Sequence, residues 1–143
     1  MNDETQIREV IEGRAATLKT GDVKALLAYY APQVVAFRLA PPLRQPYDAQ
    51  DPAPLERWFA TFESPPQRVV TQLEIVAGGD AAYATSLDCL SATPKGMTES
   101  FSLWYRTTVG LRKIDGRWRI THEHESVPFE MDGSFRASID LKP

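Results

Sequence analysis

The spacing of apolar residues changes once along this 143-residue chain, and that change restricts the folds open to it. Before the prolines at 65 and 66, apolar side chains recur every three or four residues, which indicates amphipathic helices. After them, apolar and polar residues alternate up to residue 127, as expected of long strands. Helices followed by a run of hairpin-linked strands predict an α+β fold, in which the N-terminal helices pack on a strongly curved mixed or antiparallel sheet. Such a sheet forms a cone with one pocket at its mouth.

Three helices are predicted in the first part of the chain. The first covers residues 3–19 and ends before Gly21, the second covers 23–30, and the third begins at Asp51-Pro52. The third helix carries its large apolar side chains at helical spacing, namely Leu55, Trp58, Phe59 and Phe62. We therefore expect Trp58 in the core, where its truncation to alanine would cost about 3–5 kcal/mol.

Five strands are predicted. A β-branched and aromatic run indicates a short first strand at 34–37. The alternating runs predict four longer strands at 69–76, 81–90, 100–113 and 117–127. A proline-rich surface loop covers 41–50, and a tail with apolar anchors follows Pro128.

Composition and charge exclude several classes of protein. With 43% hydrophobic and 24% charged residues the chain reads as an ordinary globular protein, expected to form one domain over 1–143. A net charge of −3 and the lack of a visible basic stripe in the sequence argue against a nucleic-acid-binding protein. The single cysteine, Cys89, excludes an internal disulfide and a cysteine zinc cluster. The polar start is unlike a signal peptide and no apolar run approaches the ~20 residues of a membrane span, so we expect no membrane contact and a cytoplasmic protein.

The C-terminal hairpin carries a recognisable pattern. It contains Trp104-x-Arg106-x-Thr108, then RKIDGRWRI at 112–120 and HEHESVPF at 122–129. Together with Tyr29-Tyr30-Ala31-Pro32 and the ending Asp140-Leu141-Lys142-Pro143, it resembles the SnoaL-like, ketosteroid-isomerase-like branch of the nuclear transport factor 2-like superfamily. The resemblance spans nearly the whole chain and implies a cone-shaped fold with a pocket. The superfamily includes isomerases, dehydratases and hydrolases as well as non-catalytic members, so the fold implies the pocket and not the reaction.

The last predicted strand holds both histidines of the chain. Alternate residues of a strand share a face, which here groups Trp118, Ile120, His122, His124 and Ser126. Tryptophan and isoleucine mark the packed face, so we expect the histidines at the pocket and the glutamates at 123 and 125 on the other side. Histidine titrates near neutrality, which makes His124 the predicted acid–base residue, with His122 and Ser126 predicted to bind ligand. The alternative is a structural histidine bonded to a backbone carbonyl or an acid.

The turn at Asp115-Gly116 decides which residues of the preceding strand join the histidines. A two-residue turn places Tyr105 and Thr107 beside them, whereas a three-residue loop with a bulge places the other face there. We favour the second arrangement, which brings the family-like residues inside: Trp104, Arg106 and Thr108. A buried Arg106 needs a carboxylate partner, and Asp88 is the predicted partner or general base. The alternative is that Asp88 is an exposed acid of its strand.

Further site and partner predictions follow from the same residues. Tyr47 and Phe129, at a loop and a strand end, are expected to contact a ligand. His122-x-His124 could chelate a metal, but the acid that a cupin motif requires is missing, and we expect no metal and no cofactor. Because the long strands carry apolar residues on both faces, we expect a homodimer through the outer face of the sheet.

Two functions are therefore compatible with the sequence. The first is cofactor-free acid–base catalysis, of the isomerase, dehydratase or hydrolase type, on a small apolar carbonyl or hydroxyl compound. Here His124 or Asp88 would move the proton and Arg106 would stabilise developing negative charge. The second is a non-catalytic domain that binds a small molecule or only dimerises.

Overall fold

The structure, a computed structural model, describes residues 2–143. Its first helix, α1 (Asp3–Leu18), begins where the Asn2 side chain accepts a hydrogen bond from the Thr5 amide at 2.8 Å. Helix α2 (Val23–Leu27) is shorter than predicted because the first strand already begins at Tyr30, and α3 covers Ala53–Phe59. None of these helices in the described part is long and apolar enough to span a membrane.

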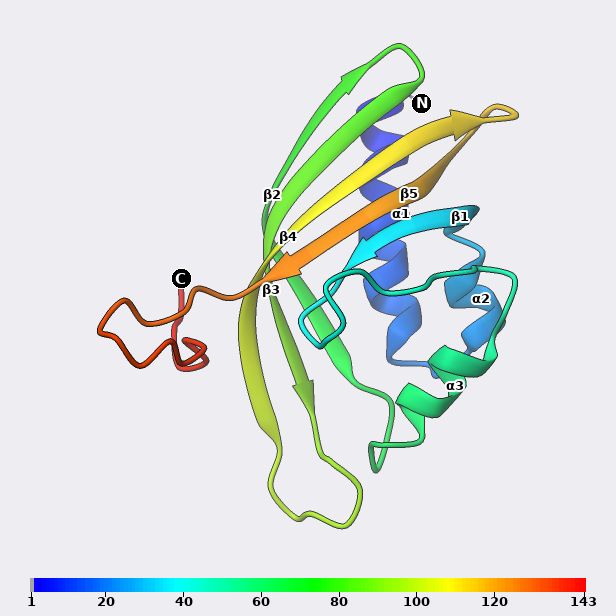
Figure 1. Cartoon of the computed structure of the whole chain (residues 1–143). Coiled ribbons are helices and arrows are strands. Elements are labelled where there is room, and N and C mark those ends of the chain that lie inside the picture. Colours follow the sequence, from blue (N-terminus) through cyan, green and yellow to red (C-terminus); the bar gives the residue numbers. More distant parts are fainter. Residues whose placement is uncertain (1) are drawn as a thin grey trace.

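The strands form one sheet in the order β1-β5-β4-β3-β2. Strand β1 (Tyr30–Phe37) runs parallel to β5 (Arg117–Ser126), and the other neighbours pair antiparallel: β2 (Gln67–Gly78), β3 (Ala81–Ala92) and β4 (Phe101–Ile114). The sheet curves around the helices without closing, so that all three helices lie on its concave side (Figure 1). The predicted α+β fold with a curved mixed sheet is confirmed.

The core lies between α1 and the concave face of the sheet. Residues Ile7 and Ile11 of α1 are spaced one helical turn apart and are almost wholly buried. They pack against a set of buried side chains from the central strands, which includes Ala84, Val109, Leu111, Trp118 and Ile120. This packing fixes the position of α1 across the sheet. It therefore also determines which side chains near the C-terminal end of α1 face the concave side.

A β-bulge divides β5 into two halves, and the alternation of inward-facing and outward-facing side chains is reversed between them. Leu111 pairs with Ile120 while Gly110 pairs with His122, so that Thr121 is an extra residue in β5. The Thr121 hydroxyl donates to the Gly110 carbonyl at 3.4 Å. A Cβ at position 110 would lie only 3.1 Å from the Cβ of His122, so glycine permits this close approach. As a result Trp118 and Ile120 face inward, but beyond the bulge Glu123 is buried and His124 is exposed.

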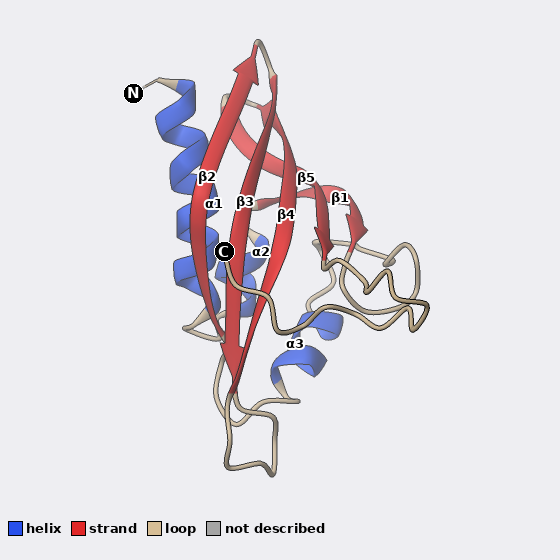
Figure 2. Ribbon diagram, turned by 90° about the vertical axis from the view of Figure 1, so that its left-hand side faces the viewer, coloured by secondary structure: helices blue, strands red, loops and turns tan. Residues whose placement is uncertain are grey.

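The residues after β5 form a projecting arm, residues 127–143, on the side of the sheet opposite the helices (Figure 1). In Figure 2, which views the outer face, the end of the arm lies in front of the sheet. The arm folds back on itself, because the amide of Glu130 donates to the Arg136 carbonyl and that of Ser138 to the Pro128 carbonyl, both at 2.7 Å.

Ile120→Ala should destabilise the fold by about 2–5 kcal/mol, because it removes a fully buried side chain from the packing between α1 and the sheet. Ile114→Ala serves as the matched control, since Ile114 lies in the same hairpin but is 39% exposed. Urea unfolding monitored by circular dichroism measures both. Equal losses of stability in the two variants would contradict the assigned core.

Candidate functional site

A cavity of about 450 Å³ lies between the helices and the concave face of the sheet. Its walls are largely apolar and come from all three helices, the loop after β1 and the sheet, including Leu18, Leu26, Tyr47, Leu55, Trp58 and Leu90. The expectation that Trp58 belongs to the core is wrong. Helix α3 has no buried residue, and Trp58 is a half-buried wall of the cavity that packs against Phe59 and Phe62.

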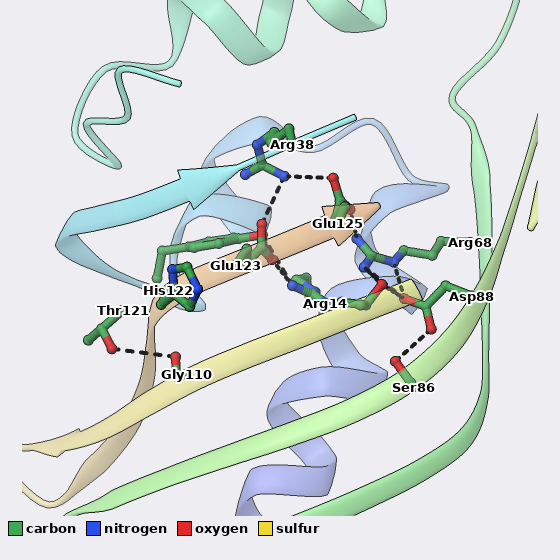
Figure 3. Close-up of polar contacts among 12 residues, drawn as sticks. Arg14, Arg38, Arg68, Ser86, Asp88, Gly110, Thr121, His122, Glu123 and Glu125 are labelled. Atoms are coloured by element: carbon green, nitrogen blue, oxygen red, sulfur yellow. Dashed lines mark hydrogen bonds and ion pairs between the residues drawn. The ribbon is translucent and has the colours of Figure 1, made fainter. Parts of the chain in front are cut away.

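Charged groups gather at the inner end of the cavity (Figure 3). The carboxylate of Glu123 is fully buried, and its Oε1 accepts a hydrogen bond from the Tyr30 hydroxyl at 2.6 Å. Arg14 of α1, itself 2% exposed, forms an ion pair with the same oxygen. Arg38 places Nη1 2.8 Å from the second oxygen, Oε2. Glu123 thus joins α1, β1 and β5 through one hydrogen bond and two ion pairs, and its Oε2 has no hydrogen-bond partner within the described residues.

A second buried cluster surrounds Asp88 on β3. Arg68 places Nε 2.9 Å and Nη2 2.7 Å from Oδ2 of Asp88, and Thr107 donates to the same oxygen at 3.0 Å. The Ser86 hydroxyl donates to the other oxygen at 2.8 Å. Asp88 is therefore buried as a partner of an arginine, as its place in an apolar strand suggested, but the arginine is Arg68 and not Arg106.

Glu125 lies between the two clusters. Its Oε1 lies 3.6 Å from Nη1 of Arg38, and its Oε2 lies 3.4 Å from Nη1 of Arg68. Both separations exceed ordinary hydrogen-bond length, and no hydrogen bond to this carboxylate forms within residues 2–143. Glu125 lines the cavity. It is an ionic carboxylate with free acceptor capacity at the cavity wall.

Arg14 has the complementary property, because two of its donors are buried and unused. Its Nε and Nη2 have no hydrogen-bond partner within the described residues, although the side chain is 2% exposed and lines the cavity. Burial, and next the charge of Arg68, lower the pKa of the Arg14 guanidinium below its ordinary value. Leaving buried donors without acceptors costs free energy.

Aromatic rings cover the other two arginines. The guanidinium of Arg38 lies 5.1 Å from the ring centre of Tyr47, and that of Arg68 lies 5.4 Å from the ring centre of Tyr105. Burial lowers the pKa of Arg68, but Tyr105 and the carboxylates of Glu125 and Asp88 outweigh it, so the net pKa is raised. Burial also raises the pKa of the Tyr47 and Tyr105 phenols above their ordinary value.

The expectation that both histidines face the pocket is wrong. His124 is exposed on the outer face, and Nδ1 of His122 donates to the Val35 carbonyl at 2.7 Å, which is the structural alternative considered for a histidine. Phe37 contacts both imidazoles edge-on. The cause is the bulge at Thr121, which reverses the alternation between Ile120 and the histidines.

The other predicted residues divide between the two faces. The residues Trp104, Arg106, Thr108 and Ser126 share the histidine face, as the favoured register required, but that face is the outer one. The turn itself has two residues, Asp115 and Gly116, both at positive φ, and the bulge lies in β5 instead. Phe129 lies half-exposed in the arm, whereas Tyr47 lines the cavity.

Sequence reasoning missed Arg14, Arg38 and Glu125, which line the cavity. It also missed Glu123, their fully buried neighbour, which forms ion pairs with Arg14 and Arg38. Two signals were present. Arg14 continues the helical spacing of Ile7, Ile11 and Leu18, which places it on the buried face of α1. A glycine inside a strand pattern, here Gly110, is a known sign of a bulge.

No group of three or more metal-binding side chains lies within the described part of the chain.

A family model described as a SnoaL-like domain matches residues 7–130. A solved nuclear transport factor 2-like protein of unknown function from Pseudomonas putida KT2440 is 30% identical, with a TM-score of 0.83 over 100% of this chain and 99% of that one. No curated protein sequence matches the chain.

Two further solved structures share the fold at lower identity. A nuclear transport factor 2-like superfamily protein from Salmonella enterica serovar Typhimurium is 18% identical, with a TM-score of 0.75 over 91% of this chain and 94% of that one. A ketosteroid isomerase-like protein from Erwinia carotovora atroseptica is 18% identical, with a TM-score of 0.70 over 88% and 97%.

Glu123→Gln should destabilise the fold by about 3–5 kcal/mol, because it leaves the buried Arg14 without a charged partner. Adding Arg14→Met should recover much of that loss, since the unpaired cation is then removed. A double-mutant cycle in urea measures the coupling, with Glu4→Gln on the exposed face of α1 as the control. Additive losses in the double variant would contradict the ion pair.

The free energy of unfolding should fall as the pH rises above about 10, by up to roughly 1.4 kcal/mol per pH unit for each buried phenol. The unfolded chain loses these protons near pH 10, while the raised pKa of Tyr47 and Tyr105 keeps them bound in the fold. Tyr105→Phe should make this dependence shallower, as measured by urea unfolding at a series of pH values. An unchanged slope would show that Tyr105 ionises freely.

Proposed function

Because the chain belongs to the SnoaL-like domain family, we propose that its cavity binds a small, mostly apolar, uncharged molecule with a carbonyl or hydroxyl oxygen. The observation that carries this proposal is the pair of buried, unused donors of Arg14, on a side chain that lines a largely apolar cavity. A cavity of about 450 Å³ falls within the range of roughly 300–1,000 Å³ that small-molecule sites occupy.

The charge balance of the cavity supports an uncharged ligand. Its ion pairs join three arginines to three carboxylates, so the charges already compensate one another before a ligand enters. A buried anion would place an uncompensated charge beside Glu123 and Glu125, which is costly in a poorly solvated site. A neutral oxygen can accept from Arg14 without that cost, and a ligand hydroxyl can donate to Glu125.

Glu125 supports a second candidate function, cofactor-free proton transfer. It is the cavity carboxylate without a short hydrogen bond among the described residues, so its oxygens are available to a proton. Glu125 would take a proton from the carbon beside a ligand carbonyl, and Arg14 would donate to the oxygen as negative charge develops. For a β,γ-unsaturated ketone, Glu125 would then return the proton to the γ-carbon, which moves the double bond into conjugation with the carbonyl and needs no co-reactant. Asp88, whose oxygens accept from Arg68, Thr107 and Ser86, is less suited to this role.

A thermal-shift panel of cyclic ketones, phenols and their carboxylate analogues tests the binding proposal. Neutral members should raise the melting temperature in proportion to their occupancy, and the matched carboxylates should not. Trp58→Ala should weaken the response because it removes a cavity wall. Stabilisation by the carboxylates alone, or by no member of the panel, would overturn the proposal.

Matched variants locate the binding site and separate binding from catalysis. His124→Gln and Arg106→Gln, both on the outer face, should leave the thermal shift unchanged. For a ketone that binds, exchange of its α-protons with deuterated water, followed by NMR, reports proton transfer. Glu125→Gln should abolish that exchange and retain binding; exchange that persists would exclude Glu125 as the base.

A further inference from the structure

Arg68 is a cation of the cavity whose charge is compensated from outside the cavity wall. It comes from β2 and lines the cavity, although its side chain is only 8% exposed. Its partner Asp88 lies on β3, is fully buried, and is not one of the described residues that line the cavity. Asp88 pairs with Val70, two residues after Arg68, so the two side chains are diagonal neighbours on one face of the sheet.

The contact with Asp88 occupies one edge of the Arg68 guanidinium (Figure 3). Nε and Nη2 lie 2.9 Å and 2.7 Å from Oδ2 of Asp88, and Nη2 also donates to the Thr107 hydroxyl at 3.3 Å. Nη1 is left for Glu125, whose Oε2 lies 3.4 Å away. Arginine binds carboxylates through paired N–H groups of this kind. Asp88 therefore holds donors that the carboxylate of an anionic ligand would otherwise use.

Asp88 also completes the charge balance around the cavity. With it, the three arginines of the ion-pair network face three carboxylates. Without its charge, the same three cations would face only Glu123 and Glu125, which leaves one net positive charge beside a largely apolar space. A guanidinium does not give up its proton in a protein, so the remaining way to compensate that charge is an anion from outside.

We propose that Asp88 sets the charge preference of the cavity: by occupying Arg68 it makes the site reject carboxylates and accept uncharged ligands. The inference rests on the proposed function, because it takes this cavity as the place where a ligand binds. Asp88 does not contact the ligand and is a positioning residue that acts through Arg68. Specificity of this kind comes from an unfavourable term against the wrong ligand, here an anion that finds no free cation.

The other two carboxylates of the network have different roles. Glu123 joins α1, β1 and β5, so its replacement disturbs the fold itself. Glu125 lines the cavity, so its replacement changes the surroundings of the ligand directly. Asp88 is the carboxylate whose charge can be removed without altering a side chain of the cavity wall.

The substitution Asp88→Asn removes that charge and preserves the shape of the side chain. The amide oxygen can still accept from Arg68 and Thr107, as Oδ2 does now. The amide nitrogen can donate to the Ser86 hydroxyl, which now donates to Oδ1. The variant therefore isolates the charge of Asp88 from its packing.

Acetophenone and benzoate test the inference, because they have nearly the same shape and differ by a methyl group against a charged oxygen. Isothermal titration calorimetry at neutral pH should show that the wild type binds acetophenone more tightly than benzoate. Asp88→Asn should bind benzoate at least about tenfold more tightly than the wild type does, and acetophenone to within about threefold of the wild type. Damage to the structure alone would weaken the binding of both ligands.

Two further variants serve as controls. Asp80→Asn makes the same charge change at an exposed position between β2 and β3, and should leave both affinities unchanged. Arg68→Gln/Asp88→Asn restores the charge balance, and should lose the gained affinity for benzoate. Circular dichroism confirms folding. If Asp88→Asn unfolds on its own, urea unfolding with benzoate present should show that this anion restores the fold.

A folded Asp88→Asn that binds benzoate no better than the wild type does overturns the inference, as does an unfolded one that benzoate does not rescue. A gain that persists in Arg68→Gln/Asp88→Asn, or that Asp80→Asn also shows, overturns it as well. The proposed function fails separately, if the wild type binds neither acetophenone nor another neutral ligand. The affinity of Asp88→Asn for benzoate decides the inference in either case.

Discussion

A fully buried carboxylate, that of Glu123, holds together the parts of the fold that enclose the cavity. It contacts Arg14 from α1, Tyr30 from the start of β1 and Arg38 from just beyond the end of β1, so one side chain sets how helix, edge strand and sheet meet. An ionised carboxylate is tolerated at this depth only because these partners compensate it. The extra residue Thr121 is what turns Glu123 inward.

The same arrangement determines which polar groups remain without short hydrogen bonds near the cavity. Glu123 pairs with Nη1 of Arg14, and Nε and Nη2 of Arg14 have no acceptor within residues 2–143. Arg38 and Arg68 lie 3.6 Å and 3.4 Å from the oxygens of Glu125. A donor and an acceptor thus meet at the end of an apolar cavity whose charges are balanced. The aromatic rings of Tyr47 and Tyr105 lie over Arg38 and Arg68 and add cation–π attraction to these ion pairs.

Much of the fold could be predicted from the sequence because burial imposes a period on it. The helical spacing of Ile7 and Ile11, and the alternation along β3 and β4, gave the right elements in the right order. The site could not be predicted in the same way, because the extra residue Thr121 in β5 reverses which side chains of the rest of that strand point inward. Period-based reasoning therefore placed His124 inside and Glu125 outside. For Asp88 on β3 the sequence left an interior and an exposed position open, and the structure buries it.

The side-chain Nε–H of Arg14 offers the most direct test of this account, because it is buried and unpaired within residues 2–143 and belongs to a side chain that lines the cavity. In ¹⁵N-labelled protein its resonance can be identified by its loss in Arg14→Lys. The account predicts that a neutral ketone or phenol, added to saturation, shifts this resonance and leaves the His124 imidazole resonances unchanged. A ligand that shifts the His124 resonances and leaves the Arg14 Nε–H where it was would contradict the account.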